Sequence, residues 1–256
     1  LLQLRLGVKS LPPIVSKLIQ IKAEGHPFFS EELAYALRDA GMIRLEDGEC
    51  VLVTEEKDLA LFDFPETIQG VITSRIDRLS PQQTLTLKVA SVIGRVFAFK
   101  ILQDVHPIPD DRSHLMEYLN NLDRLDITPL ETPEPDLSYI FKHIITQEVA
   151  YNLMSFAQRR QLHQSVAQWY EKSYGKNGGQ LFDIKDSRSI TLKNSLNQRD
   201  SLAPYYSLLA YHWSKAQDDE RAMQYFGRAG EDALRQFANQ EAVDFFREAL
   251  ALDQKF

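Results

Sequence analysis

The chain has 256 residues, of which 44% are apolar, and this is enough for two or three small domains that each bury a core. Its 29 Lys and Arg residues and 36 Asp and Glu residues give a formal net charge of −7, which disfavours nonspecific attraction to nucleic acid or anionic membranes. The single cysteine excludes an intrachain disulfide, and no run approaches the roughly 20 consecutive apolar residues of a transmembrane helix. We therefore expect a cytoplasmic protein with no membrane insertion and no direct nucleic-acid partner.

Residues 1–62 are predicted to form two amphipathic helices, one before and one after Gly25, and a small hairpin. The second helix is expected to begin at Pro27, because the N–H that proline lacks would have no partner at the first helical position. Two apolar runs flank Asp47-Gly48, a dipeptide typical of tight hairpin turns. Since the chain starts at Leu1 within an apolar segment, we expect it to be a portion of a longer polypeptide.

Residues 63–142 are predicted to form a winged-helix domain, with three helices followed by a hairpin over 80–142. Apolar residues return to helical spacing after Pro65, and Ser80-Pro81 is typical of an N-cap followed by a proline at the first helical position. The later elements of this domain are predicted to be helices over 99–105 and 111–125, then strands over 127–130 and 137–141 on either side of a turn-rich segment.

The C-terminal part is predicted to be helical apart from one insertion. Residues 143–174 are expected to form a helical hairpin, and residues 175–200, rich in Gly, Ser, Asn and Asp, a flexible insertion. Within residues 201–256 a pattern of small and aromatic residues recurs after 20 positions: Ala222, Phe226 and Ala229, then Ala242, Phe246 and Ala249. This near-repeat predicts the start of a tetratricopeptide-like array, or successive helices rather than whole repeats, because that family's period is about 34.

The predicted fold class is thus mainly α: a helical lid with a small β-hairpin, a winged-helix domain, and then α-helical, tetratricopeptide-like hairpins. Within this fold the sequence offers no enzyme signature. It lacks the Gly-x-x-x-x-Gly-Lys-Ser/Thr loop that cradles phosphates and the Gly-x-Ser-x-Gly turn of a nucleophile. Its six histidines do not pair at the spacing of metal ligands. We therefore predict no catalytic residue and no metal site in this chain.

A winged helix can bind DNA when its third helix presents a basic face. Over 110–125 four acidic residues outnumber two arginines. A helix that faces phosphates needs excess Lys and Arg, so this helix is predicted to be a packing element. The charged residues are Asp110, Asp111, Arg112, Glu117, Asp123 and Arg124.

Five ordered segments resemble the region that follows the P-loop domain in STAND-type signal-transduction ATPases attached to class III adenylate/guanylate cyclases of the soluble adenylyl cyclase-like kind. The first is a Gly-x-Pro-Phe-Phe-x-Glu-Glu-Leu segment from Gly25 to Leu33, and another runs from Phe141 to Tyr151. The remaining segments are 65–72, 75–79 and 90–94. The resemblance covers about 1–174 and 203–256 and excludes the insertion.

The resemblance implies a nucleotide-gated switch that binds ATP or ADP through an NTPase domain outside this chain, with a cyclase as output and a protein partner on the repeats. It implies that Pro27, in the turn after Gly25, lies against the adenine, and that His143 contacts the diphosphate with Lys142 beside it. Structural alternatives remain open: a helix-start proline, a capping or core histidine, and a solvated lysine. Two other functions also remain open, a STAND-type transcription regulator and a nucleotide-independent repeat adaptor.

Overall fold

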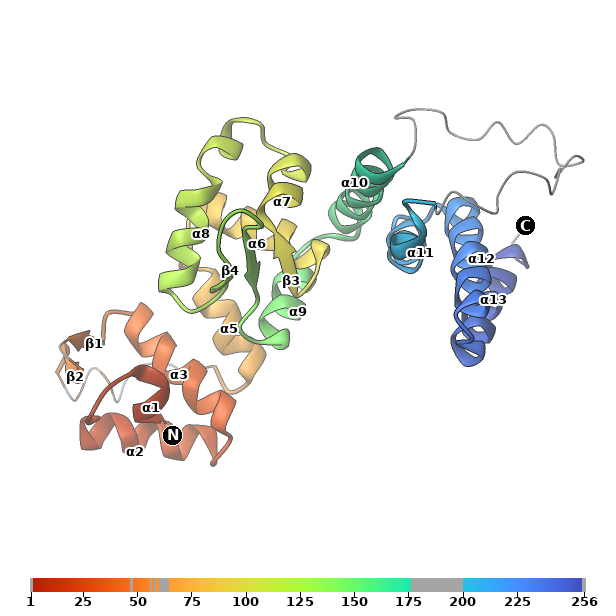
Figure 1. Ribbon diagram of the computed structural model, residues 1–256. Coiled ribbons are helices and arrows are strands. Elements are labelled where there is room, and N and C mark those ends of the chain that lie inside the picture. Colours follow the sequence, from red (N-terminus) through yellow and green to blue (C-terminus); the bar gives the residue numbers. More distant parts are fainter. Residues whose placement is uncertain are drawn as a thin grey trace, which may run out of the picture. The chain divides into compact units, whose positions relative to one another are not determined.

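The computed structural model describes residues 2–46, 48–55, 57, 59, 65–175 and 200–254. The protein is mainly helical with two small antiparallel sheets (Figure 1). It divides into two compact units: Leu1–Leu102 with His106–Leu153, and Gln103–Val105 with Met154–Phe256. Within the described ranges, each helix is too short or too polar to cross a bilayer.

The first unit begins with the helices α1 (Leu2–Leu6), α2 (Pro13–Ala23) and α3 (Pro27–Asp39), followed by the strands β1 (Ile43–Glu46) and β2 (Glu49–Leu52). Proline at the start of α2 and α3 confirms the two predicted helices, and the antiparallel β1–β2 pair confirms the hairpin. Gly48 in the turn has φ +77°, a left-handed conformation that glycine adopts without steric cost, while Asp47 lies outside the described residues. These elements share one core around Val15, Ile19, Leu33 and Leu37.

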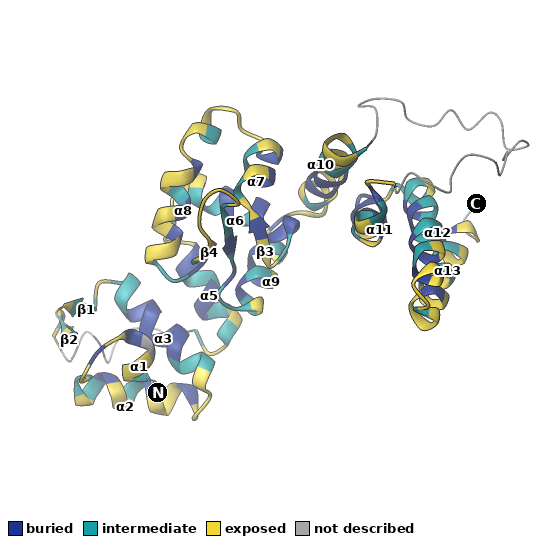
Figure 2. Ribbon diagram, viewed as in Figure 1, coloured by how far each residue is buried: buried dark blue, intermediate teal, exposed yellow. Residues whose placement is uncertain are grey.

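The rest of the first unit alternates helices with a three-stranded sheet. The elements in chain order are α5 (Ile68–Ile76), α6 (Pro81–Ile93), β3 (Val96–Ala98), α7 (Phe99–Val105), whose last three residues belong to the second unit, the 3-10 turn η1 (Asp110–Ser113), α8 (Leu115–Arg124), β4 (Leu130–Thr132), β5 (Ser138–Ile140) and α9 (Ile144–Asn152). The predicted cap of α6 is confirmed, because Ser80 accepts the amide of Gln83 and the Gln83 side chain accepts the amide of Ser80. On α8 a buried stripe of leucines faces the core, and the opposite face is exposed (Figure 2).

Three details of this region differ from the sequence predictions. The strand predicted over 127–130 is shifted to β4. The amide of Ile127 bonds to the carbonyl of Leu122 and continues the end of α8, and over the described residues 127–129 only the carbonyls of Ile127 and Pro129 accept bonds, from the amides of Lys142 and Ile140. The helix predicted over 111–125 is divided at His114 into η1 and α8. The strand β3 was not predicted, yet it pairs with β5 and gives the sheet the order β3-β5-β4.

The second unit is built from α10 (Phe156–Tyr174), α11 (Tyr206–Lys215), α12 (Asp219–Arg235) and α13 (Asn239–Asp253), with the 3-10 turn η2 (Ala203–Tyr205) before α11. Trp213 is fully buried at the centre of this unit's core. The near-repeat falls on α12 and α13, so the 20-residue offset relates successive helices. Of the predicted flexible insertion 175–200, residues 176–199 lie outside the described part of the chain.

Candidate functional site

The turn between α2 and α3 presents two of the predicted site residues. Glu24 and Gly25 are both left-handed, with φ of +49° and +82°, and they reverse the chain so that α3 can begin at Pro27. A Cβ added to Gly25 would meet nothing within 4 Å, so the residue type is set by backbone conformation and not by crowding. Pro27 itself is exposed.

Gly25 and Pro27 line a pocket of about 590 Å³ in the first unit. Among the residues whose side chains the structure describes, no charged residue lines this pocket, and its walls combine apolar side chains with amides and hydroxyls. The other lining residues are Leu2, Gln3, Leu11, Ser16, Ile19, Gln20 and Ser30. Such walls suit an uncharged, flat group better than a phosphate, because a phosphate needs cations or backbone N–H groups.

The other two predicted residues, Lys142 and His143, lie at the start of α9. His143 is the N-cap residue, in an extended conformation, and its ring lies 4.1 Å from the ring of Phe28, measured between centroids. Since Phe28 directly follows Pro27, the starts of α3 and α9 are neighbours. The N-cap residue of α3 is His26. In the described structure neither the His26 nor the His143 side chain makes a capping hydrogen bond to its own helix.

The prediction of a solvated Lys142 is wrong. Its side chain is only 19% exposed, and its ammonium donates to the Tyr35 hydroxyl at 2.6 Å and contacts Glu31 at 3.0 Å and Asp126 at 3.3 Å. The Nε2 atom of His143 lies 3.8 Å from the same Glu31 oxygen. Glu31 therefore faces both side chains that the resemblance assigns to the diphosphate.

Arg75 continues this arrangement as a second cation, now deeply buried. Its guanidinium contacts Glu32 at 2.7 Å and Asp39 at 2.8 Å, and it donates to the carbonyl of Leu125 at 2.6 Å. Arg38 donates to the same carbonyl at 2.9 Å. We call the whole set the ionic cluster: Glu31, Glu32, Tyr35, Arg38, Asp39, Arg75, Asp126 and Lys142.

The Tyr35 ring lies at the centre of the ionic cluster. Arg38, Arg75 and Lys142 each place their charge within 4.6 to 5.0 Å of its centroid, a cation–π geometry. Its hydroxyl donates to Glu31 at 3.1 Å while accepting from Lys142. One aromatic side chain of α3 thus orders cations from α3, from α5 and from the residues that precede α9.

Burial and pairing act in opposite directions on the charges of the ionic cluster. The pKa of Glu32 is raised overall, because the effect of burial outweighs the opposing effect of the Arg75 charge. Burial also opposes ionisation of Glu31, but the hydrogen bond and charge of Lys142 lower its pKa overall. Burial lowers the pKa of Lys142, but the Tyr35 hydroxyl and Glu31 raise it overall, so the ammonium stays charged at neutral pH.

The Arg75 half of the ionic cluster was not predicted from the sequence, although the sequence carries a signal for it. Arg75 follows Val71 and Ile72 by four and three positions, which places a charge on the buried face of α5. Glu31 and Glu32 likewise belong to a continuous buried stretch of α3. Charged residues at core positions are rare unless they are paired, so this rule could have predicted that Glu31, Glu32 and Arg75 form buried ion pairs.

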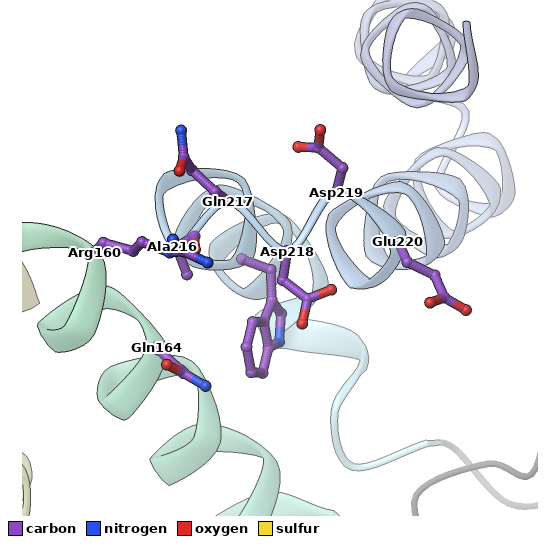
Figure 3. A pocket seen from close by; sticks show the side chains of 8 residues that line it. Arg160, Gln164, Ala216, Gln217, Asp218, Asp219 and Glu220 are labelled. Carbon is purple, nitrogen blue, oxygen red and sulfur yellow. Dashed lines mark hydrogen bonds between the residues drawn. The ribbon is translucent and has the colours of Figure 1, made fainter. Parts of the chain in front are cut away.

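The second unit has its own pocket of about 360 Å³, between α10 and the turn from α11 to α12 (Figure 3). Its charged residues have roles in stabilising helices, because Asp218 caps α12 and the Arg160 guanidinium donates to the carbonyl of Ala216. Figure 3 shows that the carboxylates of Asp219 and Glu220 point in different directions. Acidic residues in the first turn of a helix favourably oppose its dipole. We therefore assign no ligand to this pocket.

Two histidines that are 49 residues apart in sequence meet inside the second unit. His163 of α10 and His212 of α11 are each 1% exposed, and their Nδ1 atoms lie 2.8 Å apart. Burial lowers the pKa of His163 to about 4 and that of His212 to about 3. Both imidazoles are therefore neutral at pH 7. Over the described residues there is no group of three or more side chains suited to hold a metal ion.

Comparison with known protein families gives one match. Residues 1–51 match a domain of unknown function (DUF8739), which corresponds to α1 to α3 and most of the β1–β2 hairpin. No curated protein and no solved structure matches the chain. The described residues that line the pocket beside Pro27 all belong to the matched segment, whereas Lys142 and His143 lie outside the matched segment.

Proposed function

We propose that this chain is the regulatory part of a multidomain, cytoplasmic ATP-binding signalling protein of the STAND class. In this proposal α1 to α3 and the β1–β2 hairpin form the lid of an NTPase domain located elsewhere in the polypeptide. Residues 63–142 form a winged-helix domain, residues 143–174 a helical hairpin, and residues 201–256 the start of a tetratricopeptide-like array that binds a protein partner. The chain itself is not an enzyme, and a cyclase domain is the proposed output.

The observation that carries the proposal is the meeting of two segments that the resemblance assigns to one nucleotide. Lys142 and Tyr35 are 107 residues apart in sequence and bond at 2.6 Å, and the His143 ring packs on Phe28. The pocket beside Pro27, whose described lining is uncharged, can take a base, and the start of α9, where the His143 side chain makes no capping bond, can take phosphate oxygens. The two environments match the two chemical halves of ADP.

The order of elements supports the winged-helix assignment. From α6 to β5 the order is a helix, a short strand, the helices α7 and α8 with the 3-10 turn η1 between them, and an antiparallel strand pair, and β5 is the central strand. The exposed face of α8 includes Glu117 and Asp123, so we infer that it does not bind DNA. The buried small residues Ala222, Ala229 and Ala242 support close helix packing of the repeat type in α12 and α13.

The mechanism we propose is a shift between two conformations. ADP that touches both Pro27 and His143 favours the arrangement in which the starts of α3 and α9 are neighbours. Exchange for ATP favours another arrangement, in which the repeats become available to a partner. A ligand can shift such an equilibrium only by its difference in affinity for the two states, so the contacts of His143 must differ between them.

The test measures ADP affinity in the native polypeptide that contains this chain. We expect His143→Ala to weaken ADP binding at least roughly tenfold, because a hydrogen bond to a charged group contributes about 1.5–3 kcal/mol. His114→Ala, which removes an exposed histidine at the start of α8, serves as the matched control and should leave the affinity unchanged. Equal affinities in the wild type and the His143→Ala variant would refute the proposal, as would the lack of a P-loop in the native polypeptide. A helix-turn-helix domain at either end would instead favour a transcription regulator.

A further inference from the structure

The two cations at the centre of the ionic cluster differ in how firmly they are held. Arg75 is 3% exposed, and it contacts two carboxylates that are themselves 1% and 7% exposed, together with a main-chain carbonyl. Three of its five N–H donors bind these acceptors and its face lies over the Tyr35 ring, so this buried guanidinium is poorly placed to take up a ligand. Arg75 is therefore a fixed structural link between α3, α5 and the turn after α8.

Lys142 is held differently, although its ammonium also has three oxygen partners. Its side chain is 19% exposed, and one of the partners, Asp126, is 38% exposed. A lysine ammonium is a compact charge on a flexible stem, so it can change partners at low cost when one side is open to solvent. Glu31 is the buried carboxylate that keeps Lys142 turned toward Tyr35.

The charge balance of the ionic cluster opposes an incoming anion. Four carboxylates, those of Glu31, Glu32, Asp39 and Asp126, face three permanent cations, those of Arg38, Arg75 and Lys142. The set therefore carries one negative charge in excess. Glu31 lies closest to the proposed phosphate position, because its oxygen is 3.8 Å from His143 Nε2. Glu31 therefore opposes phosphate binding in two ways: its charge repels the phosphate, and it holds the Lys142 ammonium that the phosphate would need.

We propose that Glu31 is a positioning residue that withholds Lys142 from an anionic phosphate ligand at the start of α9, so that ligand and Glu31 compete for one ammonium. This inference rests on the proposed function and concerns the regulation of the same site. Binding of a diphosphate moves Lys142 from Glu31 to the phosphate oxygens and leaves Tyr35 bonded to Glu31. The contact between α3 and the residues before α9 thereby depends on whether the ligand is present.

The experiment uses the native polypeptide that contains this chain, with inorganic pyrophosphate and ADP as separate probes in titration calorimetry. Glu31→Gln keeps the shape of the side chain and removes its charge, so we expect pyrophosphate affinity to rise roughly five- to tenfold, within the usual range of coupling between sites. The gain should vanish in the Glu31→Gln/Lys142→Met double variant. Tyr35→Phe removes one acceptor of Lys142 and should give a smaller gain. Glu46→Gln, which neutralises an exposed carboxylate paired with Arg44, is the matched control and should leave affinity unchanged.

The outcomes separate this inference from the proposed function. A purely structural Glu31 would lower the melting temperature of the Glu31→Gln variant and weaken the binding of both probes, and this result would overturn the inference. A gain that persists without Lys142 would overturn it as well. If Glu31→Gln binds pyrophosphate more tightly but no variant binds ADP, the inference stands and the proposed function fails. If neither the wild type nor Glu31→Gln binds either probe, both are refuted.

Discussion

The buried pair His163 and His212 predicts that the second unit loses stability in mild acid. The folded pKa values of about 4 and about 3 both lie below the ordinary histidine value of 6.5. The unfolded chain therefore takes up two protons near pH 6.5 that the folded unit does not accept. Because the unfolded state binds more protons, the free energy of unfolding is highest above pH 6.5 and falls as the pH drops toward 4.

The magnitude follows from the two shifts. Each unmatched proton changes the free energy of unfolding by about 1.36 kcal/mol per pH unit, so the pair contributes a slope of about 2.7 kcal/mol per pH unit below pH 6.5. Integrated from pH 7 to pH 5, the loss is about 3–4 kcal/mol. This is a large part of the 5–15 kcal/mol by which a typical domain is stable.

The assay is urea denaturation followed by tryptophan fluorescence at pH 7 and pH 5. Both tryptophans of the chain, Trp169 and Trp213, belong to the second unit, so the signal follows the unfolding of this unit. The His163→Gln/His212→Gln variant should lose about 3–4 kcal/mol less than the wild type over this pH range, because its side chains do not titrate. His114→Gln, at an exposed histidine, should behave as the wild type. Equal losses in the wild type and the double variant would refute the reasoning.

Two further predictions concern single residues in each unit. Arg75→Met leaves two buried carboxylates without their cation and should lower the free energy of unfolding by about 3–5 kcal/mol, whereas Arg44→Met, in an exposed pair, should change it by less than about 1 kcal/mol in calorimetry. On α12, Gly227→Ala should stabilise the second unit by about 1 kcal/mol, because a Cβ there meets nothing within 4 Å and alanine favours helix. Gly230→Ala should not stabilise the unit in urea denaturation, because its Cβ would lie 2.7 Å from the Phe246 ring. Equal effects of the two alanine substitutions would contradict the packing of α12 on α13.

The helices could be predicted where the sequence carries a local signal. Pro27 and the Ser80 cap set helix starts through interactions within a few residues, and both starts agree with the structure. The strand β3 could not be predicted, because three residues show no readable alternation and its pairing partner β5 lies about forty positions away. Whether Thr128 lies in a strand likewise depends on contacts that the sequence does not show.

In the candidate site too, local features could be predicted from the sequence and distant contacts could not. That Pro27 and His143 begin helices is a local property, and the structure agrees. The partners of Lys142 are not local, since Tyr35 is 107 residues away, so the sequence alone favoured a solvated lysine. Arg75 stands on the apolar face of α5, which signals a buried partner, but Glu32 is 43 residues away and could not be named from the pattern.

The carbonyl of Leu125 accepts hydrogen bonds from both Arg38 and Arg75, so truncating the chain before this residue would remove partners of α3. A polypeptide ending near residue 51 would keep Glu31, Glu32 and Asp39 in a folded core while losing Arg75 and Lys142, so Arg38 would be left to balance three carboxylates. The stretch that matches a domain of unknown function is for this reason not electrostatically self-sufficient.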